Sequence, residues 1–379
     1  MRVAMLGWEL PPRRSGGLGT HCYELIRQLV KKGVVVDFYM PKVDYKVEES
    51  GANIIFVDYT PVKPYGSEAR NYFENVTAYN RKCVESVIER ASSLNTQYNL
   101  THCHDWLTAL AGIELKHKLK KPFVLTIHST EYDRTANLFP WNKIVEIEKS
   151  GVSIADRIIT VSRRTKVQLV DRYNAKADKI KVIYNAIDPT RFKGIKVYKR
   201  GERIVMYFGR LTVQKGPDFF LRAAKKVSEF ESNVRFVVAG TGEMLQQLIE
   251  LAIQLGIDDK VTFTGYVPDE SIPELYALAD VFVLPSVSEP FGIAPLEAMA
   301  CGVPTIISKT SGVSEIVRSC LLVDFWDVDE MANKIIAILR YDALSRTLRE
   351  EELREICERR FSWENAAEET IKLYNELLK

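Results

Sequence analysis

The sequence predicts an α/β protein of two domains, each a doubly wound, Rossmann-like parallel sheet, and three observations support this prediction. The chain has 379 residues, enough for two domains of roughly 150 residues or more. Apolar runs of strand length alternate with helical stretches along most of the chain. The alternation begins at RVAMLGW (2–8) and begins again at RIVMYFG (203–209). Two consecutive arrays of this kind predict two sheets, each covered by helices on both faces.

The individual elements follow from local patterns. The opening strand leads into a glycine-containing loop and then a helix from Thr20 to Lys32, which Gly33 ends. The other strands expected in the first half are VVVDFYM (34–40), NIIFVDY (53–59), the apolar part of NLTHC (99–103), PFVLTIH (122–128) and DRIITVS (156–162). In the second half a helix is expected from Pro217. The further strands there are VRFVVAG (234–240), KVTFTGY (260–266), DVFVLPS (280–286) and VPTIIS (303–308).

The pattern is interrupted near YNAIDPTRF (184–192), where Pro189 precedes a lysine-rich stretch. We therefore expect an N-terminal domain over 1–190, a C-terminal domain over 191–358 and a terminal helical segment over 359–379. Ligands of doubly wound sheets bind beyond the carboxyl ends of the strands. A site is therefore expected on the loops that follow the strands, in a cleft between the two domains.

The composition indicates a soluble globular protein, with 46% hydrophobic and 27% charged residues. No apolar run approaches the roughly 18 residues of a membrane span, and the first apolar run is too short for a signal-peptide core, so a cytoplasmic protein is expected. The net charge of +2 gives no reason to expect nucleic-acid binding. Residues 1–188 nevertheless hold 28 basic and 21 acidic residues, against 24 and 29 in the remainder.

The cysteines and histidines do not predict a metal site. The six cysteines lie far apart without a C-x-x-C pair and are expected to be reduced. The cluster HCHD (102–105) has no second ligand cluster elsewhere, so no metal is expected there. The D-x-D sequence DVD (327–329) precedes a helix and is interpreted as its cap. No cofactor and no particular oligomeric state are predicted.

The segment EPFGIAPLEAMACG (289–302) carries two carboxylates. Glu289 is expected on the loop after strand 280–286, and Glu297 in the first turn of a helix that starts at Pro295. Gly292 lets the backbone approach a ligand closely, and the free N–H groups of the helix start can donate to sugar hydroxyls or phosphate oxygens. For Glu297 alone, a first-turn carboxylate stabilised by the helix dipole by about 0.3–1 kcal/mol is the simpler interpretation.

A second loop, GRLTVQKGP (209–217), places Arg210 and Lys215 before a helix N-terminus, an arrangement suited to binding phosphate. It lacks the glycine spacing and the Lys-Ser/Thr pair of a Walker loop. Two solvated cations are the alternative interpretation of this loop taken alone.

Three further features lie at the ends of first-half strands. The loop GGLG (16–19) does not have the spacing of a dinucleotide fingerprint, and Asp37 lies inside its strand, so a dehydrogenase is not favoured over a tight turn that needs glycine. Asp105 and His128 are expected where strands end toward the cleft. Taken singly, each is also compatible with a capping or structural role.

Together these motifs resemble the retaining, nucleotide-sugar-dependent glycosyltransferases of the GT-B type, which include glycogen and starch synthases and bacterial mannosyltransferases. The resemblance extends over nearly the whole chain, and the glutamate pair in EPFGIAPLEAMACGVP is its most specific part. The matching segments are WELPPRRSGGLGTH, HDW, LTIH, ADRIITVS, VIYNAID, YFGRLTVQKG, VVAGTGE, FTGYVPDE, LPSVSEPFGIAPLEAMACGVP and FSWENAAEETIKLY.

The resemblance implies how the donor is held. Arg210 and Lys215 would neutralise the leaving pyrophosphate, and Glu297 would hold the ribose hydroxyls. The donor sugar would contact Glu289 and the backbone of Phe291, Gly292 and Ile293. The family transfers the sugar with retention and usually without a metal.

The resemblance also assigns roles to the first half. His128 would contact the sugar near the reacting carbon, Asp105 would lie on the acceptor side, and Gly16 and Gly17 would let the N–H groups of the first loop approach the phosphates. The terminal helix, with an apolar face that includes Trp363, would cross back to the first domain.

The donor is expected to be a UDP-, ADP- or GDP-hexose, with glucose from UDP- or ADP-glucose favoured, and the acceptor a glucan, a small sugar or a lipid-linked sugar. Arg13-Arg14-Ser15 stands where glycogen synthases usually carry a Lys before the first glycine pair, which leaves a small acceptor open. The basic first half is compatible with a phosphorylated or anionic acceptor, but solvated basic faces, including KHKLKK (116–121) and SRRTK (162–166), are the simpler interpretation. Peripheral membrane contact is not indicated.

Functions of other classes remain as alternatives at this stage. They are a glycoside hydrolase, which would act without nucleotide; a nucleotide-sugar epimerase, which would need no acceptor; and a nucleotide-sugar sensor, which would bind donor without turnover.

Overall fold

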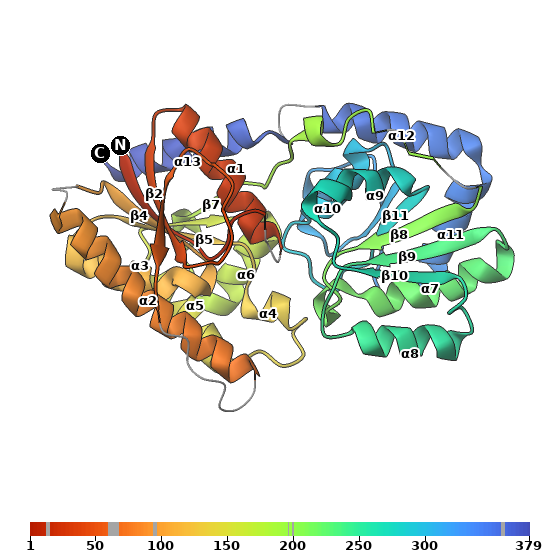
Figure 1. Ribbon diagram of the computed structural model, residues 1–379, viewed down its shortest axis with the longest axis horizontal. Helices are drawn as coiled ribbons and strands as arrows, with labels where there is room; N and C mark the ends of the chain where they lie inside the picture. Colours follow the sequence, from red (N-terminus) through yellow and green to blue (C-terminus); the bar gives the residue numbers. More distant parts are fainter. Residues whose placement is uncertain (13–15, 60–67, 94–96, 196, 199–200, 358–360) are drawn as a thin grey trace. The chain divides into compact units, whose positions relative to one another are not determined.

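A computed structural model of the chain describes residues 1–12, 16–59, 68–93, 97–195, 197–198, 201–357 and 361–379. The chain divides into two compact units, each with its own sheet (Figure 1). Unit 1 comprises Met1–Glu131, Pro140–Asn185 and Trp363–Lys379, and unit 2 comprises Tyr132–Phe139 and Ala186–Ser362. In the described residues, no helix is both long and apolar enough to cross a membrane.

Unit 1 is built on a seven-stranded parallel sheet in the order β3-β2-β1-β4-β5-β6-β7. Its strands are β1 (Arg2–Leu6), β2 (Val35–Pro41), β3 (Asn53–Val57), β4 (Leu100–His104), β5 (Phe123–Ile127), β6 (Arg157–Thr160) and β7 (Ile180–Val182). Every residue of β4 and β5 is buried, as expected for parallel strands that helices cover on both faces.

The helices of unit 1 connect these strands and close the unit. They are α1 (Gly17–Lys31), α2 (Glu68–Ser93), α3 (Asp105–Leu119), α5 (Asn142–Ile154), α6 (Arg163–Tyr173) and α13 (Trp363–Leu377); in the sequence, the division between the units falls within the short α4 (Glu131–Arg134). The terminal helix α13 packs against α1 (Figure 1), and its Tyr374 hydroxyl lies 2.6 Å from Nδ1 of His102 in β4. The end of the chain is therefore part of the N-terminal unit, as the resemblance implied.

Unit 2 has a six-stranded parallel sheet in the order β10-β9-β8-β11-β12-β13. The strands are β8 (Arg203–Phe208), β9 (Val234–Ala239), β10 (Val261–Gly265), β11 (Val281–Leu284), β12 (Thr305–Ser308) and β13 (Leu321–Val323). The helices are α7 (Pro217–Phe230), α8 (Leu245–Leu255), α9 (Ile272–Leu278), α10 (Ile293–Ala300), α11 (Val328–Arg340) and α12 (Asp342–Ile356). The predicted class of two doubly wound α/β sheets is confirmed.

Each sheet reverses its strand order once, and such a reversal is where ligands of this architecture usually bind. In unit 1 the chain winds outward in opposite directions from β1 and β4, and in unit 2 from β8 and β11. Crevices at such switch points, beyond the carboxyl ends of the strands, are the usual ligand sites of this architecture. Arg210 and Lys215 follow β8, Glu289 follows β11, and His104 ends β4.

Some local expectations are confirmed and others are wrong. Helix α7 begins at Pro217, and Asp327 caps α11 by accepting a hydrogen bond from the Glu330 N–H at 2.9 Å. The first helix begins at Gly17 instead of Thr20, because glycine at this position does not prevent a helical first turn.

Helix α10 begins at Ile293 instead of Pro295, because Gly292, with a φ of 100°, already turns the chain into the helix. Proline is tolerated as its third residue, since the first N–H groups of a helix have no intrahelical acceptor. Glu297 therefore lies beyond the first turn, and the interpretation of it as a first-turn carboxylate is wrong.

Candidate functional site

The loop after β8 is anchored so that Arg210 faces solvent. The Tyr207 hydroxyl donates to the Arg210 carbonyl at 2.8 Å, and one Arg210 guanidinium nitrogen donates to Oε1 of the buried Gln214 at 3.0 Å. The Arg210 side chain is exposed while its backbone is fixed. A cation held in this way is prepared to meet an anionic ligand without much loss of conformational freedom.

The loops after β8 and β11 are in direct contact. The carbonyl of Gln214 accepts hydrogen bonds from the N–H groups of Val287 at 3.0 Å and Ser288 at 3.3 Å. Gly216 has a φ of 62°, and a Cβ there would lie 2.3 Å from the carbonyl oxygen of Pro285. Only glycine fits this approach, which brings the Lys215 loop beside the Glu289 loop.

Lys215 and Glu289 form an ion pair at this contact. The Lys215 ammonium is bonded to Oε2 of Glu289, and the Ser286 hydroxyl lies 3.4 Å from the same oxygen. The Glu289 side chain is 7% exposed and that of Lys215 17%. Because an ammonium has three donors, Lys215 can bind a phosphate oxygen and keep part of this contact.

The start of α10 presents backbone groups beside this pair. The carbonyls of Glu289 and Phe291 are already used, since they accept hydrogen bonds from the N–H groups of Gly312 and Val313, each at 2.8 Å. The first N–H groups of α10, beginning at Ile293, have no intrahelical acceptor and can donate to a ligand. One turn further, Glu297 accepts a hydrogen bond from the Tyr276 hydroxyl at 3.0 Å, which fixes its carboxylate.

Two glycines of this region were not singled out from the sequence. The Leu211 N–H donates to the Thr241 carbonyl at 2.8 Å, so the loop after β9 lies against the loop after β8. A Cβ at Gly240 would lie 2.0 Å from the Gly209 carbonyl oxygen, and one at Gly242 would lie 2.3 Å from that of Leu211. The G-T-G sequence after a strand was the available signal, because it permits the close approach that supports Arg210.

In unit 1, Asp105 holds the backbone next to His128. Its carboxylate Oδ1 accepts hydrogen bonds from the N–H groups of His128 at 2.6 Å and Ser129 at 3.4 Å, and the residue is 5% exposed. Asp105 has a φ of 54°, a region that Asp enters more readily than most residues. The structure thus joins the end of β4 to the end of β5 through this carboxylate.

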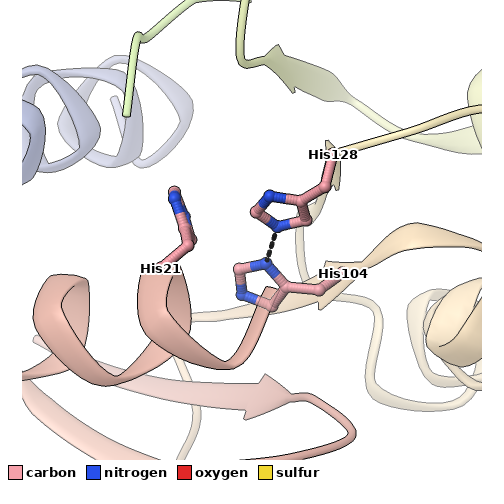
Figure 2. A group of neighbouring side chains, drawn as sticks. All are labelled: His21, His104 and His128. Carbon is pink, nitrogen blue, oxygen red and sulfur yellow. Dashed lines mark hydrogen bonds between the residues drawn. The ribbon is translucent and has the colours of Figure 1, made fainter. Parts of the chain in front are cut away.

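His128 also contacts other histidines (Figure 2). Its Nε2 lies 3.0 Å from Nδ1 of His104, and its ring packs edge-on against that of His21 with centroids 4.4 Å apart. Burial lowers the pKa of His21 to about 4 and holds the pKa values of His104 and His128 well below 6.5. All three imidazoles are therefore uncharged at neutral pH. The sequence did not associate His21 with this group.

The first glycine loop is only partly described. Gly16 has an extended backbone, Gly17 begins α1, and both are exposed. The first N–H groups of α1 are thus available to a ligand at the carboxyl end of β1. Arg13, Arg14 and Ser15 lie outside the described residues.

Comparisons with known proteins identify the family. Residues 15–191 match the family described as Glycosyltransferase Family 4, and residues 190–355 match Glycosyl transferases group 1. An uncharacterized glycosyltransferase of Methanocaldococcus jannaschii is 34% identical over 393 residues, covering 99% of this chain and 98% of its own. The chain belongs to the group 1 glycosyltransferases.

Two further similarities extend over the length of this glycosyltransferase. The D-inositol 3-phosphate glycosyltransferase of Nocardia farcinica is 27% identical over 410 residues, covering all of this chain and 90% of its own. Among solved structures, sucrose-phosphate synthase from Thermosynechococcus elongatus has a TM-score of 0.85 at 24% identity, covering 99% of this chain and 98% of that one. The latter supports the GT-B fold.

In this glycosyltransferase the expected site residues form two groups. Arg210, Lys215, Glu289 and the start of α10 lie together at the switch point of unit 2. Asp105, His128 and the start of α1 lie at the switch point of unit 1. Each group is assembled from loops that follow adjacent central strands.

Proposed function

We propose that this chain transfers a hexose, with retention of its anomeric configuration, from a nucleotide sugar to a hydroxyl group of an acceptor. Glucose from UDP- or ADP-glucose is the proposed donor group. The observation that carries the proposal is the arrangement of Arg210, Lys215 and Glu289 on two contacting loops at the switch point of unit 2.

The cations are proposed to bind the diphosphate of the donor. Departure of a nucleoside diphosphate builds negative charge on the phosphate oxygens, and cations fixed in advance stabilise that charge most effectively. Arg210 meets this requirement through its bond to Gln214, and Lys215 through its bond to Glu289. No metal is needed for charge neutralisation in this arrangement.

The start of α10 is proposed to bind the rest of the donor. The hydroxyls of the donor sugar would be held by Glu289 and by the backbone of Phe291, Gly292 and Ile293. Glu297 would accept hydrogen bonds from the ribose hydroxyls. The support for this assignment is geometric: Glu289 and Glu297 are both fixed by side-chain partners, Lys215 and Tyr276.

Unit 1 is proposed to provide the acceptor side. His128 would contact the sugar near the reacting carbon, and Gly16 and Gly17 would let the N–H groups at the start of α1 approach phosphate oxygens. Asp105 is buried and bonded to the His128 N–H, so we propose that it acts by positioning His128.

We propose that the acceptor is phosphorylated. Residues 1–188 carry the basic excess, and the names of the similar proteins, D-inositol 3-phosphate glycosyltransferase and sucrose-phosphate synthase, include a phosphate. The two basic segments differ in position. Residues 116–121 span the end of α3, at the amino edge of the sheet, whereas Arg163 and Arg164 begin α6 at the carboxyl edge, where the proposed site lies, and both are exposed.

Replacing Arg163 and Arg164 with alanine is expected to raise the KM for a phosphorylated acceptor by at least about tenfold, because one charge-assisted hydrogen bond accounts for about 1.5–3 kcal/mol. The KM for the nucleotide sugar should not change. Lys118→Ala is the matched control, because Lys118 lies at the amino edge and pairs with Glu114 on the surface. Steady-state kinetics with a sugar phosphate and the same sugar without phosphate measure the effect. Equal loss with both acceptors would rule out phosphate recognition by these arginines.

The proposed function is tested by incubating the purified chain with UDP-, ADP- and GDP-hexoses, each with inositol 3-phosphate, other sugar phosphates, unphosphorylated sugars or glucan. We expect nucleoside diphosphate release that depends on both a nucleotide sugar and an acceptor. Turnover with GDP-mannose would reassign the donor within the same reaction class. Conversion of the nucleotide sugar without an acceptor would indicate an epimerase. Cleavage of a glycoside without a nucleotide would indicate a hydrolase, and binding of the nucleotide sugar without turnover would indicate a sensor.

A further inference from the structure

Three of the five histidines of the chain form a cluster that the proposed reaction does not explain. His21 lies in α1, His104 ends β4 and His128 follows β5 (Figure 2). One ring nitrogen from each residue lies within 4.8 Å of the corresponding nitrogens of the other two. The neighbouring His102 has a different environment, since its two nitrogens already face the hydroxyls of Tyr374 and Thr126 at 2.6 and 2.7 Å.

The hydrogen-bond partner of His21, Asn185, shows which nitrogen of the His21 ring carries the hydrogen. The His21 Nδ1 lies 2.7 Å from Oδ1 of Asn185, which can only accept, so Nδ1 carries the hydrogen and Nε2 presents a lone pair. That Nε2 is buried and has no hydrogen-bond partner among the described residues. Nε2 of the fully buried His104 also has none. Buried polar atoms without a protein partner are uncommon, and a bound water or ion is the usual reason for one.

The cluster has the chemistry of a transition-metal site. Zn²⁺ binds neutral imidazole nitrogens at about 2.0–2.1 Å, which separates two nitrogens of a tetrahedral site by about 3.4 Å. His104 Nδ1 and His128 Nε2 are hydrogen-bonded to each other at 3.0 Å, so one of them carries a hydrogen that must move to the other nitrogen of its ring before both can bind the ion, and His21 must also approach. Asn185 supplies the second-shell acceptor that orients a metal-bound histidine.

We propose that His21, His104 and His128 bind one divalent transition-metal ion such as Zn²⁺. His128 is the least buried of the three, so the ion enters from its side. Because the proposed function assigns His128 to the donor sugar, a bound ion competes with that contact and inhibits transfer. This inhibition rests on the proposed function, whereas metal binding does not.

Binding is tested with Co²⁺ as the probe, added to the full-length chain after treatment with a chelator. Exposed Cys357 is replaced by serine in every sample, so that its thiol does not contribute ligands. We expect one equivalent of Co²⁺ to produce the visible absorption of a tetrahedral site, and one equivalent of Zn²⁺ to displace it. His21→Ala should weaken binding at least tenfold, and His104→Gln provides a second variant should the first not fold. His117→Ala is the control, because His117 is exposed on α3, outside the cluster.

Absence of a one-equivalent Co²⁺ signal, or equal affinity of wild type and His21→Ala, would overturn the metal site. Inhibition is measured separately, as the ratio of transfer rates with and without stoichiometric Zn²⁺. Binding without a fall in that ratio would overturn the inhibitory role. A chain without any transferase activity would refute the proposed function, while the Co²⁺ titration would still decide the metal site.

Discussion

Replacing Lys215 with alanine is expected to lower the turnover of the nucleotide sugar by about 10²–10³-fold, the usual effect of removing one preorganised group that stabilises transition-state charge. The physical reason is that the loop after β8 fixes the Lys215 ammonium beside Glu289, where its position is set before the donor binds. Arg210→Ala should lower the turnover of the nucleotide sugar to a similar extent, because Gln214 fixes the Arg210 guanidinium in a similar way. Steady-state rates of nucleoside diphosphate release measure both effects.

Lys225→Ala is the matched control for Lys215→Ala. Lys225 lies on α7, directly after the same loop, and forms an exposed pair with Glu229 four residues later. Such pairs contribute little to stability, so this variant should keep wild-type turnover. Circular dichroism and thermal unfolding confirm that each variant is folded. Unchanged donor turnover in a folded Lys215→Ala protein would exclude the assigned role in leaving-group stabilisation.

Glu289→Ala is expected to lower kcat/KM for the nucleotide sugar by about 10²-fold, while affinity for the nucleoside diphosphate alone stays the same or increases. Removing the carboxylate deletes the proposed contact to the sugar hydroxyls, which the diphosphate alone does not make. It also releases the Lys215 ammonium from its present partner, so phosphate no longer competes with Glu289 for it. Calorimetric titration with the nucleoside diphosphate, combined with transfer kinetics, separates the two effects.

Glu297→Gln provides the contrasting variant. Its carboxylate is bonded to Tyr276 and is assigned to the ribose, which both the diphosphate and the intact donor contain. We therefore expect it to weaken binding of both ligands to a similar extent. If Glu289→Ala weakened binding of the nucleoside diphosphate as strongly as binding of the intact nucleotide sugar, the proposed contact of Glu289 would have to be reassigned from the sugar to the nucleotide.

The alternation of strands and helices was enough to predict the fold, because buried parallel strands appear as continuous apolar runs. The three-residue edge strands β7 (Ile180–Val182) and β13 (Leu321–Val323) were not predicted, since runs of that length carry no periodicity. The sequence predicts the start of α10 two residues late, at Pro295, because proline is preferred at the first helical position; in the structure the positive φ of Gly292 already turns the chain into the helix.

The candidate site, like the fold, could be predicted from the sequence only in part. Arg210, Lys215, Glu289 and Glu297 lie in short segments with local signals, so the sequence identified them and strand order then explains their proximity. The residues that the sequence did not identify act across long separations. Gly240 and Gly242 matter only because their loop contacts the loop of Gly209, and His21 joins His104 and His128 only through packing at the switch point of unit 1. Contacts of that kind depend on the sheet topology, which local patterns do not specify.

Transfer of a hexose from a nucleotide sugar with retention fixes the anomeric configuration of the product. It is measured by proton NMR of the reaction mixture, recorded as an acceptor is glycosylated from an α-linked UDP- or ADP-hexose. We predict that an α-glycoside and a nucleoside diphosphate form in equal amounts, and that neither forms in a folded variant lacking both Arg210 and Lys215. A β-linked product would exclude retention, and transfer that persists in that variant would exclude leaving-group stabilisation by Arg210 and Lys215.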